Sequence, residues 1–132
     1  MTGFTDAYED ALLAGVFGLA AYPGTNAMVS VGLSTTAPNE GGTVTELSGS
    51  GYARVAVPAG TWASTGVGTM KNSAAVTFPA ASGDWGTVSH FHAWTATTGG
   101  TMIMFGSLGT NQNVPSGGTA SFGSAALSFT LD

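Results

Sequence analysis

The sequence predicts a mainly β protein, an antiparallel β-sandwich or jelly-roll-like domain with one amphipathic α-helix near its N-terminus. Three observations predict this fold. Apolar residues alternate with period two in several short runs after residue 25, and glycine-rich turns separate those runs. Helical periodicity is confined to the first 20 residues. With 132 residues, 43% of them hydrophobic, the chain is long enough to bury the core of a single domain.

The first expected element is a helix from about Asp6 to Phe17. Asp6 followed by Glu9 resembles a capping box, and acids in a first turn are favoured by the helix dipole. Gly18 suits a C-terminal stop, and Pro23-Gly24 closes the region. We therefore expect a helical arm over residues 1–24 and a β-sandwich domain over residues 25–132.

The apolar side chains of this helix fall on two adjoining stripes. Tyr8, Leu12 and Val16 recur at a spacing of four residues. Leu13 and Phe17 repeat the same spacing beside them. Residues four apart lie on one face of an α-helix, so the helix is expected to be amphipathic.

Six runs with period-two alternation follow, and each predicts a strand. They cover residues 28–34, 52–57, 74–78, 88–94, 102–105 and 127–131. The residues expected to share one face of each run are Val29, Val31 and Leu33; Ala53, Val55 and Val57; Ala74, Val76 and Phe78; Val88, His90, His92 and Trp94; Ile103 and Phe105; and Leu127, Phe129 and Leu131. Turn clusters lie at residues 38–42, 48–51, 82–84, 99–100 and 115–118. Residues 59–70 suit either a weak strand pair around Trp62 and Val67 or an ordered loop.

The charge content is very low and excludes several classes of partner. The chain carries two basic and seven acidic side chains, 7% of its residues, where soluble domains usually carry about 25%. Almost no cation is available to neutralise phosphates, so we expect no binding to nucleic acid or to anionic membranes. Exposed charge normally keeps folded monomers apart, so its scarcity favours a protein that is packed into a larger assembly.

The segment from Leu12 to Ala21 is apolar but does not read as a signal peptide. Acids precede it where a secretory segment carries bases, and no apolar run reaches the roughly 20 residues of a membrane span. We expect a soluble protein that is synthesised in the cytoplasm without an export signal. The chain has no cysteine, so disulfides and thiolate metal sites are excluded.

No constellation of residues predicts an enzyme. His90 and His92 point to one side of their strand, but a metal needs a third ligand and the sequence has no other histidine. A polar strand face or a subunit contact is the expected role of this pair. No G-x-S-x-G elbow is present. Glu40, Glu46 and Asp84 are expected to be loop acids rather than a catalytic pair. We expect no metal, no cofactor and no catalytic residue.

Arg54 and the three tryptophans are the remaining candidates. Arg54 lies in a run of Tyr, Ala and Val. Its guanidinium can donate two parallel hydrogen bonds to a carboxylate, supplied by Glu46 or by a neighbouring subunit. A structural salt bridge is the expected role, with a ligand contact as the alternative. Trp62, Trp85 and Trp94 are expected in the core or at a subunit interface, with a sugar platform as the alternative.

Several blocks of the chain, taken in order, resemble a widespread family of small tailed-phage virion proteins, many of them labelled tail-fibre proteins. The blocks are Asp6–Leu13, Val31–Pro38, Thr45-Glu46, Gly51–Val55, Asn72–Pro79, Asp84–Phe91 and Leu127–Leu131. The sequence departs from the family pattern at His92-Ala93-Trp94, where relatives carry Gly, an aliphatic residue and Phe. The family has no catalytic motif to transfer, so the resemblance implies a non-enzymatic part of a virion.

Together with the charge deficit, the resemblance favours a capsid decoration (cement) protein on the outer head surface. Its expected partners are the major capsid protein and copies of itself in a homotrimer. The residues expected to form the interface or anchor are Tyr8, Leu12, Leu13, Val16, Phe17 and Arg54. The alternative is a tail-fibre or baseplate module that binds host surface glycan or protein through the turns at 99–100 and 115–118.

Overall fold

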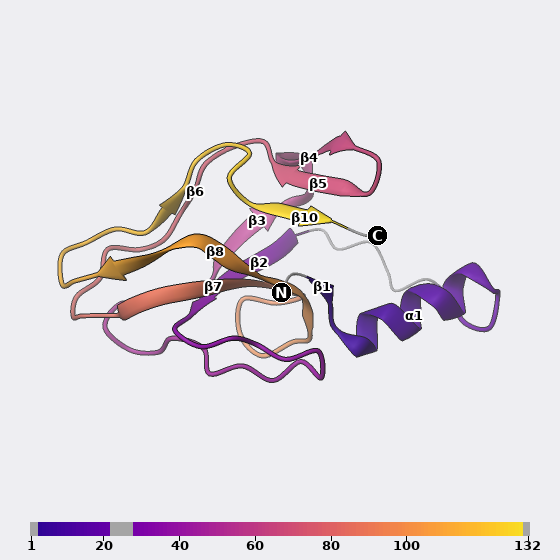
Figure 1. The fold of residues 1–132 in the computed structure, drawn as a ribbon, viewed down its shortest axis with the longest axis horizontal. Coiled ribbons are helices and arrows are strands. Elements are labelled where there is room, and N and C mark those ends of the chain that lie inside the picture. Colours follow the sequence, from indigo (N-terminus) through magenta and orange to yellow (C-terminus); the bar gives the residue numbers. More distant parts are fainter. Residues whose placement is uncertain (1–2, 22–27, 131–132) are drawn as a thin grey trace.

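Antiparallel β-strands make up most of the regular structure in this computed structural model, which describes residues 3–21 and 28–130. In chain order the elements are β1 (Gly3–Phe4), α1 (Asp6–Val16), β2 (Met28–Ser34), β3 (Val55–Pro58), a 3-10 turn (Ala59–Thr61), β4 (Trp62–Gly66), β5 (Thr69–Asn72), β6 (Val76–Thr77), β7 (Gly86–Trp94), β8 (Met102–Val114), β9 (Ser121–Phe122) and β10 (Ser128–Thr130). The predicted mainly β fold with a helix near the N-terminus is confirmed (Figure 1).

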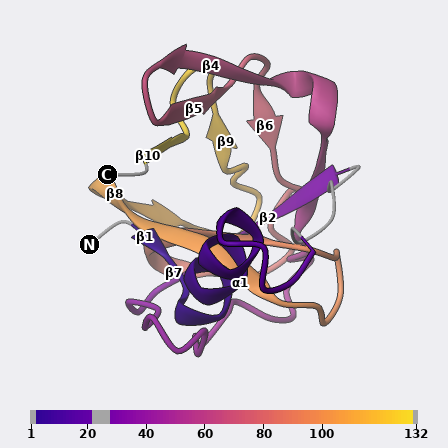
Figure 2. The same ribbon diagram turned by 90° about the vertical axis from the view of Figure 1, so that its right-hand side faces the viewer.

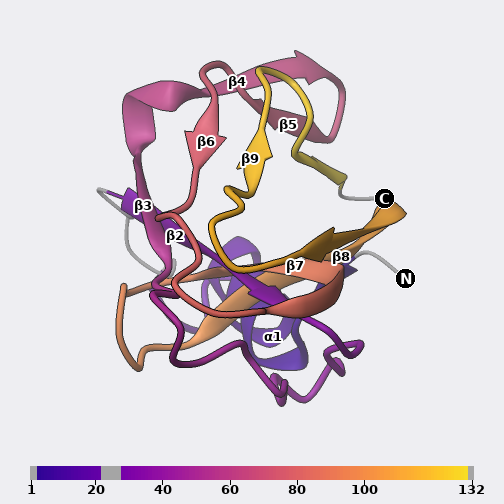
Figure 3. The ribbon, with the colours of Figure 1, turned by 90° about the vertical axis from the view of Figure 1, so that its left-hand side faces the viewer.

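The strands form a large sheet and two small ones. The large sheet has five strands in the order β1-β8-β7-β2-β3, and the small sheets have the orders β10-β5-β4 and β6-β9. Viewed from the helix end, the small sheets lie above the five-stranded sheet (Figure 2). From the opposite end, β6 and β9 run side by side over β7 and β8 (Figure 3). The hydrophobic core fills the space between the layers, with Leu33 and Phe91 from the large sheet and Phe129 from β10.

The strand predictions succeed where pairing is regular. β2 has the predicted bounds, and Val31 and Leu33 on its predicted inner face are buried in the core. Residues 62–72 form the β4–β5 hairpin, the strand-pair alternative for that stretch, and Val67 lies at its turn. β3 begins at Val55, later than predicted. Leu131, expected on the inner face of the last strand, lies outside the described residues.

The prediction that Val88 shares a face with the two histidines is wrong. Val88 packs in the core with Phe91, whereas His92 lies on the opposite side, against Gly32 and Glu46. The pairing of β7 with β8 is irregular here, since Val88 lies opposite Gln112 but His90 lies opposite Ser107. Such an irregularity reverses the alternation of faces along a strand.

α1 spans the predicted region, but its start differs in detail. Thr5, not Asp6, is the N-cap residue, so the predicted capping box is wrong. The Thr5 hydroxyl donates instead to the carbonyl oxygen of Met102, at 2.7 Å. The C-terminus is as predicted: Gly18 has φ +72° and the Leu19 N–H donates to the Ala14 carbonyl at 2.9 Å, a Schellman-type end. Pro23-Gly24 and the expected boundary between arm and domain lie outside the described residues, so that division stays a prediction.

Candidate functional site

The outer half of α1 and the turn that follows it display large apolar side chains to solvent. The side chains of Leu13, Val16, Phe17 and Leu19 are 57%, 63%, 75% and 84% exposed, and we call these four residues the arm surface. α1 fully buries none of its own residues. Exposed apolar clusters of this kind mark protein–protein contacts, because their exposure to water is unfavourable.

The sequence placed Tyr8 and Leu12 with these residues, and the structure separates them. Both are half-buried, and Tyr8 packs against the hydrophobic core. Tyr8 therefore joins the helix to the domain, while Leu13, Val16 and Phe17 face outwards. The interface role that the sequence assigned to all of them is still a prediction.

The start of α1 is held firmly to the domain. The Thr5 N–H donates to the Ile103 carbonyl at 2.9 Å, and the Asp6 N–H donates to the Glu40 carbonyl at 2.8 Å. The Thr5 side chain is buried and adds its bond to Met102. From this base the helix extends away from the sheets (Figure 1). The arm surface is thus carried on a helix whose direction is fixed at its root.

A polar cluster of Glu46, Tyr52, Arg54, His92 and Trp94 packs against the outer side of β2 and β7. Arg54 forks onto Glu46, with Nε to Oε1 at 2.8 Å and Nη2 to Oε2 at 2.7 Å. Its Nη1 donates to the carbonyl oxygens of Ala96 and Gly99, at 2.9 and 2.7 Å. The Arg54 Cζ lies 3.8 Å from the centre of the Trp94 ring. Glu46 is thus the carboxylate that the sequence analysis sought for Arg54.

The other members complete the hydrogen bonding of this cluster. The Tyr52 hydroxyl donates to Glu46 Oε1 at 2.7 Å and accepts the Leu33 backbone N–H at 2.9 Å. The Trp94 indole N–H donates to His92 Nδ1 at 2.6 Å. His92 is fully buried, and its Nε2 has no hydrogen-bond partner among the described residues. Because Nδ1 accepts the hydrogen bond from Trp94, it carries no proton, and neutral His92 is the tautomer with its proton on Nε2.

The pKa values in the cluster reflect burial and pairing. Burial lowers the pKa of His92 to about 4, although the charge of Glu46 acts in the opposite direction. Burial also raises the pKa of Glu46, but the hydrogen bonds from Arg54 and Tyr52 outweigh it, and the net pKa lies below the usual value. Burial and the bond to Glu46 raise the pKa of Tyr52. At neutral pH the cluster therefore holds one ion pair and a neutral histidine.

The bonds of this cluster join segments of the chain that are distant in sequence. The Arg54 side chain is only 8% exposed, and four of its five N–H groups donate to Glu46 and to two backbone carbonyls of the turn after β7. The ion pair ties residues 46–54 and 96–99 to the face of the five-stranded sheet. A role for Arg54 at an interface between subunits stays a prediction.

The histidines and tryptophans do not come together as a metal site or a sugar platform. His90 Nδ1 lies 2.7 Å from Ser89 Oγ, and no group of three metal-ligating side chains occurs within residues 3–21 and 28–130. Trp85 is buried in the core and donates to the Ser50 carbonyl, and Trp62 packs edge-on against Phe129. Trp94 belongs to the polar cluster, so the three indoles occupy separate environments.

The loop acids are also dispersed. Asp84 Oδ1 accepts the Ser116 backbone N–H at 2.8 Å, which holds the turn after β8. Glu46 belongs to the ion pair, and the backbone of Glu40 supports the start of α1. Each acid has a structural contact of its own.

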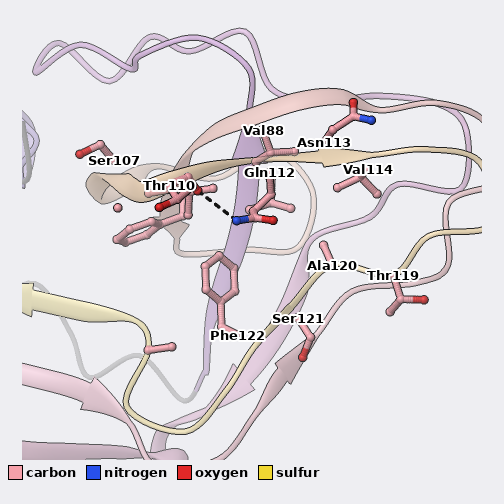
Figure 4. Close-up of a pocket in the computed structure, with 15 residues that line it drawn as sticks. Val88, Ser107, Thr110, Gln112, Asn113, Val114, Thr119, Ala120, Ser121 and Phe122 are labelled. Atoms are coloured by element: carbon pink, nitrogen blue, oxygen red, sulfur yellow. Dashed lines mark hydrogen bonds between the residues drawn. The ribbon is translucent and has the colours of Figure 1, made fainter.

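The sequence did not predict a cavity of about 430 Å³ between β8 and the chain around β9 (Figure 4). Its floor is apolar and includes Val88 and Phe91, and the ring of Phe122 points towards Gln112 across it. The other lining side chains are uncharged hydroxyls, amides and small residues. The uncharged polar run over residues 107–113 was the available signal, but strand periodicity does not show that β9 lies opposite it.

The fold and these sites define a mainly β domain. A partly buried ion pair joins its loops to the large sheet, and a helix with exposed apolar side chains projects from it. Among the described residues, no helix is both long enough and apolar enough to span a membrane. A family model described as podophage GP4 fiber I protein gp80 matches residues 3–130, and the chain belongs to that family. The resemblance to tailed-phage virion proteins is thereby confirmed, and the chain is a phage structural protein. A comparison with curated proteins finds no match.

Proposed function

We propose that this protein is a non-enzymatic subunit of a podophage fibre and that it is built into the virion through α1. The observation that carries this proposal is the arm surface, whose four large apolar side chains are each more than half exposed. The family description, which names a fiber protein, supports the fibre rather than the head as the location. The low charge of the chain suits a subunit whose surface is covered by neighbours.

A capsid decoration protein, which the sequence analysis favoured, is the second candidate. The projecting helix suits this role as well, because an arm can lie across a shell while the domain stands on it. The two candidates predict different places in the particle. Cryo-EM reconstruction of the parent virion should locate this domain along or at the base of fibres. Density repeated over the icosahedral head would replace the fibre assignment with decoration.

The role of the arm is tested by changing its surface without changing its fold. Phe17→Glu places a charge on a side chain that is 75% exposed, so the isolated protein should stay folded. Virions produced from a genome with this substitution should lack the protein in immunoblots of purified particles. Val67→Glu is the matched control, because Val67 is fully exposed at the β4–β5 turn and should be incorporated normally. Normal incorporation of the Phe17 variant would remove α1 as the attachment element.

Binding of a host surface glycan is a second activity of the same fibre subunit, and the cavity of Figure 4 supports it. An apolar floor with the Phe122 ring, edged by uncharged amides and hydroxyls, suits a neutral sugar, which offers an apolar ring face and many hydroxyls. Purified protein should compete with phage for adsorption to host cells, and Gln112→Ala should weaken that competition. If saturating wild-type protein leaves adsorption unchanged, the adhesive role is rejected.

A further inference from the structure

The same molecule carries an apolar groove on the side from which α1 projects. Two adjoining cavities, of about 250 and 260 Å³, share Met70, Met104 and Phe129 on their walls. Phe4 lines one of them, and Val29 and other apolar residues line the other. We call the combined feature the inter-sheet groove, since it opens between the five-stranded sheet and the β10-β5-β4 sheet.

The groove and the arm surface are matched in chemistry. None of the described residues that line the groove is charged. The helical arm from Ala11 to Ala21 also carries no charge, since its acids are confined to positions 6, 9 and 10. An apolar helix face laid into an apolar groove is a recurrent mode of recognition. Met70 is 42% exposed at the groove, so burying it is favourable.

The arm of one molecule cannot fill the groove of that same molecule. Phe4, on the groove wall, is followed by Thr5 and Asp6, which the Ile103 and Glu40 carbonyls hold in place. The helix leaves this point as a rod about 16 Å long, at 1.5 Å per residue, and it points away from the sheets (Figure 1). The end of the helix therefore projects away from the two sheets that form the groove, where another copy can reach it (Figure 1).

From these observations we infer that α1 of one copy docks into the inter-sheet groove of a second copy. The inference rests on the proposed function and names the partner of the arm in the assembled fibre. The contact is head-to-tail: each copy gives a helix and receives one, so successive contacts close into a ring or continue as a filament. The homotrimer expected from the sequence is a closed ring of this kind.

The available area reaches the low end of the range for specific contacts. With about 200 Å² for a fully exposed Phe and somewhat less for Leu and Val, the arm surface can bury at most roughly 500 Å². With an equal area on the groove, one contact buries roughly 1,000 Å², which is near the lower bound for a specific interface. In a closed ring every copy takes part in two contacts, which doubles the area that holds it.

Two charge substitutions on opposite sides of the contact test the inference. Phe17→Glu places a charge on the arm surface and leaves the groove unchanged. Met70→Glu places a charge in the groove and leaves the arm surface unchanged. Both side chains are exposed, so both variants should fold, as circular dichroism will show. By light scattering, the wild type should be oligomeric and each variant alone should be a monomer. A mixture of the two variants should form a 1:1 dimer with twice the monomer mass. In that dimer the unchanged arm of the Met70 variant docks into the unchanged groove of the Phe17 variant.

Three results would overturn the inference: a monomeric wild type, oligomers of either single variant, or a mixture that stays monomeric. Cysteine cross-linking gives an independent readout, because the wild-type chain has no cysteine. Phe17→Cys mixed with Met70→Cys should yield a disulfide-linked dimer under mild oxidation. Phe17→Cys mixed with Ser116→Cys, a position in the turn after β8, should give far less. Equal yields would contradict docking at the groove.

This outcome is separable from that of the proposed function. If the isolated protein is monomeric but Phe17→Glu still abolishes incorporation into virions, α1 binds a different virion protein. The fibre proposal then stands and the docking of copies fails. If Phe17→Glu and wild type are incorporated equally while the mixed variants dimerise, docking stands and the attachment role of α1 fails.

Discussion

Replacement of Arg54 by alanine should cost a large part of the stability of the domain. The substitution removes the fork onto Glu46, two bonds to backbone carbonyls and the stacking on Trp94. It also leaves the Glu46 carboxylate, which is only 20% exposed, with the Tyr52 hydroxyl as its remaining side-chain partner. Removing one member of a fully buried ion pair usually costs about 3–5 kcal/mol, because the other charge stays desolvated. Since Glu46 is partly exposed, we expect a loss at the lower end, about 3 kcal/mol. For a domain of this size the melting temperature should fall by roughly 10–20 °C.

Urea unfolding followed by tryptophan fluorescence measures this loss, since Trp94 lies against the guanidinium. Arg54→Lys keeps the charge but loses the fork and should lie between wild type and alanine. The double variant Arg54→Ala with Glu46→Ala should lose less stability than the two single variants lose in sum, because it leaves no unpaired charge in the cluster. Lys71→Ala is the control, because Lys71 forms no ion pair within the described residues. A loss below about 1 kcal/mol for Arg54→Ala would refute the structural role of the ion pair.

Three further predictions concern the packing around this cluster and the root of the helix. Gly32→Ala should destabilise by about 1–3 kcal/mol in urea unfolding, since its Cβ would lie 2.5 Å from His92 Cε1, whereas Gly60→Ala, in open space, should be nearly neutral. Burial lowers the pKa of His92 to about 4, so the unfolded chain binds protons more tightly and stability should fall by about 3 kcal/mol from pH 6.5 to pH 4. His92→Gln should flatten that part of the pH profile, and an unchanged slope would assign it to other groups. Thr5→Val leaves the Met102 carbonyl without its hydroxyl donor, so the free energy of unfolding should fall by about 1 kcal/mol. Amide hydrogen exchange in α1 should become faster. Unchanged exchange would mean that this bond does not hold the helix to the domain.

The periodicity of the sequence correctly predicted the strands whose pairing with their neighbours is regular. β2 is correct in its bounds because alternation over seven residues meets straight antiparallel pairing on both sides. The end of α1 is correct because a glycine at positive φ is a local requirement of that helix terminus. β3 was predicted too long, because its pairing with β2 ends at Val31 and Val55. Beyond that point the β2 backbone pairs with residues 46–47, through the bridge between Ser34 and Glu46 and the bond from the Leu47 N–H to the Leu33 carbonyl.

The sequence predicted two pairs within the site but not the whole cluster. Glu46 was one of the two carboxylate sources considered for Arg54, and His92 and Trp94 were expected on one face of the same strand. Sequence spacing gives no reason to place Arg54 and Glu46 beside His92 and Trp94. The 430 Å³ cavity was missed for the same reason, since it depends on the slip in pairing between β7 and β8.

The sequence by itself determined the inventory: nine charges in 132 residues, a helical period at the start, strand periods after it and glycines at the turns. These properties are local or compositional, so they hold whatever the chain packs against. Only the tertiary structure decided which faces are covered, that Arg54 is paired internally, and that Phe17 is exposed while Tyr8 is packed. Burial and desolvation are sums over contacts from distant segments, and it is these sums that set the pKa of His92 and leave the arm surface open to a partner.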